Sequence, residues 1–245
     1  MKNITDLTTA ETILFPVDTI PFNFLLIFTN LQKLTKTLKF KSIETPEDEN
    51  KNILSLTMTT GEFHHNDTIY PVEKLMIERN RILVAIKADS DVTDNFCQTI
   101  IKFLSEIDPY KRIHDTNKKI RTYITNCIVT LDFDHMQLFS PKFRTFIHKN
   151  VTKACSSAIS DVARVHIEPR NLSFNIVYSH LKKSLVDPDF QISSKLLTIE
   201  PRVGTNPRER RFFTSSPTNS KTHIKLLQDL EKALSRREKL RTSGK

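Results

Sequence analysis

The stretch RTYITNCIVTLDFD, residues 121–134, alternates apolar and polar side chains along its length. Successive side chains of a β-strand point to opposite faces, so this pattern predicts a long strand with one buried face. Ahead of it, apolar residues at helical spacing predict a helix over residues 91–107. After it, Ser140-Pro141 begins a second predicted helix, residues 141–162, because serine caps helix N-termini and proline suits the first turn.

The segments on both sides of this centre continue the mixture of strands and helices. We predict further strands over residues 22–28, 53–60, 68–77, 81–88, 172–178 and 192–199, a helix over 30–40 and a closing amphipathic helix over 221–241. Residues 1–20 show no period clear enough to assign. Ferredoxin-like and TATA-binding-protein-like folds share this general order of elements, although a likeness of order alone carries no function.

The predicted elements fall into two halves of similar order. We therefore expect an α+β protein: a pseudo-duplicated body of two antiparallel sheets with packed helices, plus a basic C-terminal linker and helix. The expected divisions are residues 1–109 for the first half, 120–200 for the second, 201–220 for a flexible basic linker and 221–241 for the C-terminal helix.

Glycine is scarce, with three residues in a chain of 245, where average usage predicts about 17. Phosphate-binding loops, dinucleotide fingerprints and nucleophile elbows all need closely spaced glycines, and none of these motifs occurs. The three cysteines, Cys97, Cys127 and Cys155, are odd in number and far apart, which fits neither a disulfide framework nor a zinc pair. We expect buried thiols in a reducing, intracellular compartment.

Neither a membrane segment nor a secretory leader is expected. The longest apolar run, residues 24–28, is far shorter than the roughly 18 residues that a membrane-spanning helix needs. The first fifteen residues also lack the apolar core of a signal peptide. We therefore predict an intracellular protein without membrane contact.

Two carboxylates, Asp132 and Asp134, end the central strand. Their spacing puts both on one face, which is how a divalent-metal site of a nuclease can begin. No second acidic cluster accompanies them, so we favour a solvated strand end and keep the metal-dependent nuclease as a lesser alternative. A Ser–His–Asp arrangement depends on spatial neighbours that a sequence does not supply. We predict no catalytic residue, no metal and no cofactor.

Positive charge is concentrated at the C-terminal end. Residues 202–245 hold twelve Lys and Arg against four Asp and Glu, a net charge of +8 out of +9 for the whole chain. Such asymmetry favours a polyanionic partner. Arginines beside Phe212 and Phe213 suit single-stranded nucleic acid, because bases stack on rings while guanidinium groups pair with phosphates. The same residues also fit a nuclear-import signal or a docking peptide.

We therefore predict a non-catalytic subunit or adaptor of a nucleic-acid-associated complex. On a helix from residue 141, Lys142, Lys149 and Lys153 form one outward stripe, which suits phosphate contact. The predicted contacts to DNA or RNA are Arg202, Arg208, Arg210, Arg211, Lys221, Lys225, Lys232, Arg236, Arg237, Lys239, Arg241, Lys142, Lys149 and Lys153.

The alternative function is a protein–protein interaction subunit that docks through its C-terminal helix. A stripe of large aliphatic side chains on one side of that helix fits the groove of a partner protein. The stripe consists of Ile224, Leu227, Leu230 and Leu234. Under either function we expect one or more protein subunits as partners.

Overall fold

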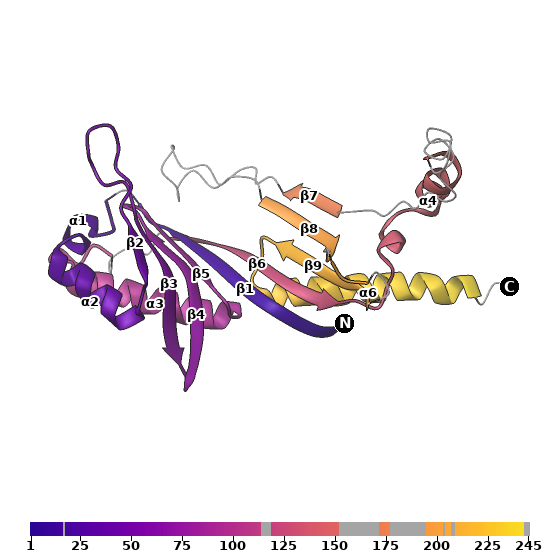
Figure 1. Ribbon diagram of the computed structural model, residues 1–245, viewed down its shortest axis with the longest axis horizontal. Helices are drawn as coiled ribbons and strands as arrows, with labels where there is room; N and C mark the ends of the chain where they lie inside the picture. Colours follow the sequence, from indigo (N-terminus) through magenta and orange to yellow (C-terminus); the bar gives the residue numbers. More distant parts are fainter. Residues whose placement is uncertain are drawn as a thin grey trace.

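The computed structural model describes residues 1–16, 18–113, 119–151, 172–176, 195–202, 204–206 and 209–242, with side chains up to Leu234 in the last helix. These residues form one antiparallel sheet of nine strands in the order β2-β3-β4-β5-β1-β6-β9-β8-β7 (Figure 1). The strands are β1 Lys2–Leu14, β2 Ser42–Glu44, β3 Leu56–His65, β4 Thr68–Ile77, β5 Arg81–Ile86, β6 Ile120–Thr130, β7 Leu172–Ile176, β8 Lys195–Pro201 and β9 Arg211–Ser216.

The α+β class is confirmed, but one continuous sheet replaces the two sheets that we expected. The reason is β1, which the sequence analysis left unassigned. It pairs with β5 on one side and with β6 on the other, so it joins both halves. Its inward side chains include Thr9 and Glu11 beside Ile13, all fully buried. These polar residues on the buried face hide the period that would have identified the strand.

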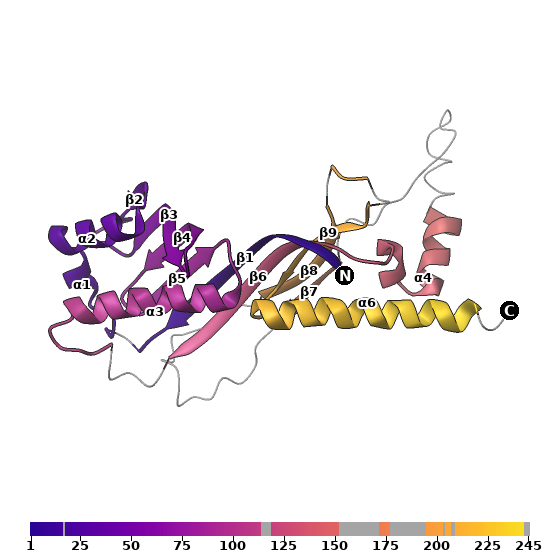
Figure 2. The same ribbon diagram turned by 90° about the horizontal axis from the view of Figure 1, so that it is seen from below.

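Two long helices, α3 Ser90–Ile107 and α6 Ser220–Thr242, lie along one face of the sheet with their N-termini meeting near its middle (Figure 2). Both were expected from their apolar spacing. The shorter helices lie toward the ends of the molecule (Figure 1). They are α1 Phe22–Leu25, α2 Phe28–Leu38, the 3-10 turn η1 His135–Leu138, α4 Pro141–Phe146 and the π-helical turn η2 Ile147–Val151.

The prediction of a strand over residues 22–28 is wrong, because the chain there begins with α1. Phe22 and Leu25, one helical turn apart, are its buried residues. A short run of apolar residues has the same appearance in a buried strand and in a buried helix, so its period could not distinguish them. Cys97 and Cys127 are buried thiols as expected, whereas Cys155 lies outside the described residues.

The expected flexible linker, residues 201–220, instead contains β9, which lies between β6 and β8 inside the sheet. Phe212, Thr214 and Ser216 are its buried side chains. Both hydroxyls make hydrogen bonds to His223 of α6, which allows polar residues to occupy a buried strand. The sequence showed only a polar, proline-containing segment, because those partners lie on another element.

Equivalent contacts tie each central strand to the helix of its own half. The Thr9 hydroxyl donates to the carbonyl oxygen of Ala88 at 3.0 Å, and the Thr125 hydroxyl donates to that of Thr218 at 2.7 Å. Thr9 and Thr125 also face each other in the register of β1 and β6. Each accepting carbonyl lies two residues before the first residue of its helix, Ser90 in α3 or Ser220 in α6.

The N-termini of these helices meet through that serine pair. The Ser90 backbone N–H donates to the Ser220 hydroxyl at 3.0 Å, and the two hydroxyl oxygens are also 3.0 Å apart. Both residues are buried. The Ser220 hydroxyl therefore satisfies one of the N–H groups that a helix N-terminus leaves without an intrahelical partner.

We predict that Ser220→Ala lowers the free energy of unfolding more than Ser90→Ala does. The first change leaves the buried Ser90 N–H without its acceptor, which costs about 1–3 kcal/mol, whereas the second keeps that bond and costs about 1 kcal/mol or less. Urea unfolding of both variants measures the difference. Equal losses would show that this N–H group finds another acceptor.

Candidate nucleic-acid interface

At the centre of the sheet, the face opposite α3 and α6 carries no helix of the described residues (Figure 1). In Figure 1 the strands lie in front of both helices, so the view is onto this face. Its centre consists of β5, β1, β6 and β9, where buried side chains alternate with half-exposed ones. We call the half-exposed set the open face. Its central residues are Thr8, Ala10, Thr12, Leu83, Ala85, Thr122, Ile124, Asn126, Ile128, Phe213 and Ser215.

The open face combines small hydrogen-bonding groups with aliphatic and aromatic contact area. The register of β6 and β9 sets Asn126 opposite Ser215 and Ile128 opposite Phe213. None of the central residues named above carries a carboxylate, but Glu200 of β8 lies opposite Phe213 on the same face. The central residues can donate hydrogen bonds and pack against a planar ligand.

Cations lie on both sides of this centre: Lys74 of β4 lies opposite Ala85, and Arg211 and Lys195 lie toward β9 and β8. Arg211 lies opposite Thr130 in the register of β9 and β6, and it is one of the predicted nucleic-acid contacts. The Lys195 ammonium donates to the Thr122 hydroxyl at 3.1 Å, and burial lowers the pKa of this lysine. Sequence analysis missed Lys195, since a lysine at the start of an apolar strand gives no local signal for where its ammonium reaches.

Most of the other described tail cations pair with carboxylates. The pairs are Arg202 with Asp6 at 3.5 Å, Arg210 with Asp132 at 2.9 Å, Lys221 with Asp91 at 2.7 Å and Lys232 with Asp229 at 3.9 Å. Within residues 209–234, Arg211 and Lys225 have no such ion pair. Exposed pairs of this kind are weak, but each one reduces the positive field. Lys153, Arg208 and the side chains of Arg236, Arg237, Lys239 and Arg241 lie outside the described residues.

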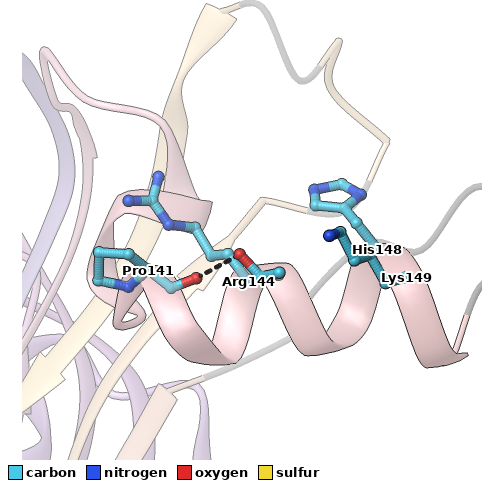
Figure 3. A pocket seen from close by; sticks show the side chains of 5 residues that line it. Pro141, Arg144, His148 and Lys149 are labelled. Atoms are coloured by element: carbon cyan, nitrogen blue, oxygen red, sulfur yellow. Dashed lines mark hydrogen bonds between the residues drawn. The ribbon is translucent and has the colours of Figure 1, made fainter.

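The second predicted basic segment begins as expected and then changes geometry. The Ser140 hydroxyl caps α4, accepting from the Phe143 N–H, and Pro141 stands in the first turn. From residue 147 the backbone is a π-helical turn, so the angular spacing assumed for Lys142 and Lys149 does not hold. Lys149 lines a cavity with four neighbours from the same segment (Figure 3). They are Pro141, Arg144, Thr145 and His148.

Sequence analysis missed Arg144 and His148, because it considered only the lysines and serines of this segment. Their separation of four residues puts two side chains on neighbouring turns of one helix face. That spacing is the signal that could have found them.

The leucine stripe of the last helix packs inside the protein. Leu227 and Leu234 are buried in a core formed with β6, β8 and β9, and Leu230 packs against that core. Ile224 is half-buried. This corrects the prediction that the stripe docks a partner, because its apolar area already covers the sheet. An apolar helix face looks the same in sequence whether its own domain or another protein covers it.

Asp132 and Asp134 are engaged in local structure. Asp132 pairs with Arg210, and the Asp134 carboxylate accepts the Met136 N–H in the cap of η1. Across the part of the chain that is described, no group of three or more His, Cys, Asp or Glu residues is arranged to hold a metal ion.

A serine–histidine pair lies inside the second core. His223 Nδ1 is 2.6 Å from the Ser216 hydroxyl oxygen, and His223 Nε2 is 2.9 Å from that of Thr214. All three residues are fully buried, and the third partner is a hydroxyl where a catalytic triad has a carboxylate. Burial lowers the pKa of His223 to about 4. His223 is therefore a neutral imidazole, and its two hydrogen bonds hold α6 on the sheet.

A buried carboxylate lies under α3. Glu11 is fully buried, and neither of its oxygens has a hydrogen-bond partner among the described residues. Burial raises the pKa of Glu11 to about 7, against the opposing charge of the Arg121 guanidinium 3.3 Å away. Arg121 also lies 3.6 Å from Asp94, which accepts the Tyr123 hydroxyl at 2.9 Å. Glu11 is the buried end of this cluster, whereas Arg121, Tyr123 and Asp94 are half-exposed beside α3.

No helix in the described ranges is both long enough and apolar enough to span a bilayer. Comparison with known proteins identifies no relative: no protein-family model, no curated protein and no solved structure matches the chain.

We predict that Glu11 and His223 give opposite pH dependences of stability. Glu11 rises from an ordinary value of 4.5 to about 7 on folding, so it lowers the free energy of unfolding as pH increases through that window. His223 falls from 6.5 to about 4, so its contribution is lost as pH decreases from 6.5 to 4. The two effects oppose each other where the windows overlap.

Single variants separate these effects. Between pH 4.5 and 6.5, Glu11→Gln should become more stable with rising pH, by up to about 1.4 kcal/mol per pH unit, and His223→Gln should become less stable by a similar slope. Urea unfolding at a series of pH values gives both slopes, with the unchanged chain as the nearly flat control. Parallel pH profiles for all three proteins would contradict this assignment.

Proposed function

We propose that this chain is a non-catalytic nucleic-acid-binding subunit or adaptor whose contact surface is the open face of its sheet. The observation that carries the proposal is the separation of the two faces. Helices α3 and α6 cover one face, while the other presents hydroxyls, an amide, apolar side chains and the cations Arg211 and Lys195, with the carboxylate of Glu200 beside Phe213. Proteins that read DNA with strands lay a ribbon or a sheet into a groove of the duplex.

The chemistry of the open face suits the minor groove of duplex DNA. Base edges in that groove offer mainly acceptors, which hydroxyl and amide donors such as Ser215 and Asn126 can satisfy. Minor-groove proteins also press apolar side chains against the base steps. Ile128 and Phe213 lie opposite each other on the open face, where they can make such contacts. Because these hydroxyl and amide donors can bond to the acceptors of different base pairs, the protein should show only a modest preference for DNA sequence.

The basic tail contributes to this proposal in two ways. Through β9 it supplies Arg211 to the open face itself. Through α6 the tail places Lys225 and its neighbours on the face opposite the open face. From there their positive charge attracts a polyanion without direct contact. The arginine cluster Arg208, Arg210 and Arg211 also fits a nuclear-import signal, so we propose a nuclear location.

We further propose that the body is pseudo-duplicated. From Arg81 to Ser90 and from Arg211 to Ser220 the chain advances nine residues, and both segments are a strand followed by a helix. The strand order is arranged alike on both sides of the β1–β6 pair, and the contacts of Thr9 and Thr125 correspond. A surface with an approximate two-fold axis fits a duplex, which has its own two-fold axes.

A second candidate function, binding of a protein subunit, is favoured by one feature. Large apolar side chains are exposed near α1 and α2, namely Ile27 at 49%, Phe28 at 74% and Tyr110 at 68%. Clustered apolar exposure of this kind often marks a protein contact. This surface would replace the leucine stripe as the docking site of the adaptor.

We predict that Asn126→Asp weakens binding of a 20-base-pair duplex at least tenfold at 0.15 M salt. The change puts a negative charge at the centre of the open face, where it repels phosphates. The matched control is Gln228→Glu, the same change of charge on the exposed side of α6, for which we expect less than a twofold effect. Fluorescence anisotropy measures both affinities, and Phe28→Asp should leave them unchanged.

If Gln228→Glu weakens binding as much as Asn126→Asp does, the contact is with the tail helix or with the overall field, and the open-face proposal fails. The salt dependence gives a second criterion. Arg211→Gln should reduce the slope of log affinity against log salt by about 0.9, the contribution of one duplex phosphate contact.

A further inference from the structure

We propose that the cavity beside α4 and η2 is a binding site for a phosphate group. Among the described residues it is lined by Pro141, Arg144, Thr145, His148 and Lys149, and its volume is about 360 Å³ (Figure 3). This volume lies in the range of small-molecule sites. The inference goes beyond the proposed function, because the cavity exists whether or not the open face binds a duplex.

The three positively charged or hydrogen-bonding side chains of the cavity come from two neighbouring turns. Arg144 and His148 rise from the same side of the helix in Figure 3, four residues apart, and Lys149 follows directly. The four-residue spacing of Arg144 and His148 gives them a common side, and a π-helical turn begins between them at Ile147. π-helical turns of this kind occur frequently at functional sites.

Among the described residues, the side-chain nitrogen atoms of Arg144, His148 and Lys149 have no hydrogen-bond or ion-pair partner. The Arg144 Nε atom is buried without a hydrogen-bond partner, although nearly all buried polar atoms in proteins have one. Within the described ranges none of Arg144, His148 and Lys149 forms an ion pair. Arg210 and Lys221 differ in this respect, because each lies beside a carboxylate. A ligand that accepts hydrogen bonds and carries negative charge would satisfy the cluster.

A phosphate group matches these donors better than other anions. The planar guanidinium of Arg144 can hold two phosphate oxygens at once, while the Lys149 ammonium adds a point charge and the His148 ring an N–H donor. The Thr145 hydroxyl already donates to the Pro141 carbonyl at 3.0 Å, so it shapes the wall without donating to the ligand. The volume exceeds that of the free ion, so the phosphate belongs to a nucleotide or to a nucleic-acid backbone.

Calorimetric titration of the full chain with adenosine monophosphate, and anisotropy with a 20-base-pair duplex, test this site and distinguish the two sources. Arg144→Gln should weaken binding of the phosphate ligand at least tenfold. Arg144→Lys keeps the charge but loses the two-oxygen contact, so it should weaken binding at least threefold. The matched control is Lys36→Gln, an exposed cation of α2 outside the cavity, with an expected effect below 1.5-fold.

Two results support the proposal. Monophosphate binding that depends on Arg144 identifies a free nucleotide, and loss of duplex affinity in Arg144→Gln alone, without monophosphate binding, identifies a backbone phosphate. Equal effects of Arg144→Gln and Lys36→Gln on every ligand, or no effect of either, overturn it. Failure of the open-face proposal is recognised separately, because it depends on Asn126→Asp and not on these variants.

Discussion

The antiparallel pairing of β1 with β6 holds the molecule together. On its other edge, β1 pairs with β5 and β6 pairs with β9. The β1–β6 pairing therefore joins a five-stranded part and a four-stranded part into one sheet. Thr9 and Thr125 face each other at its centre, and each hydroxyl bonds the chain just before a long helix. The strand pair thereby fixes where α3 and α6 begin, which is why their N-termini meet.

Because the N-termini of α3 and α6 meet, the interior between the two halves of the sheet is polar. Two helix N-termini bring unpaired N–H groups together, and Ser90 and Ser220 satisfy part of this demand. On the α6 side, hydroxyls of β9 satisfy the buried His223. On the α3 side, the Arg121 guanidinium is the cation nearest to the buried Glu11, and the Cys97 thiol also interacts with this carboxylate. The protein therefore keeps a neutral imidazole on one side and a poorly solvated carboxylate on the other.

The same arrangement separates two kinds of surface. With both long helices on one face, the opposite face carries polar and apolar side chains together with charged ones, among them Arg211 and Glu200. The cationic cavity by α4 lies toward the end of the molecule that α6 points to (Figure 2). A polyanion on this protein would meet a sheet at the centre and a separate cationic site toward one end.

The sequence by itself determined the elements whose signal is local. The apolar spacing of residues 91–107, the alternation of 121–134 and the Ser140-Pro141 start each lie within one element, and α3, β6 and α4 confirm them. Only the tertiary structure decided the rest. Thr214 and Ser216 can occupy a buried strand because His223 bonds them, and Leu227 is hidden because its own sheet lies beneath it. Burial of these residues depends on partners from other elements, and such partners leave no period in the local sequence.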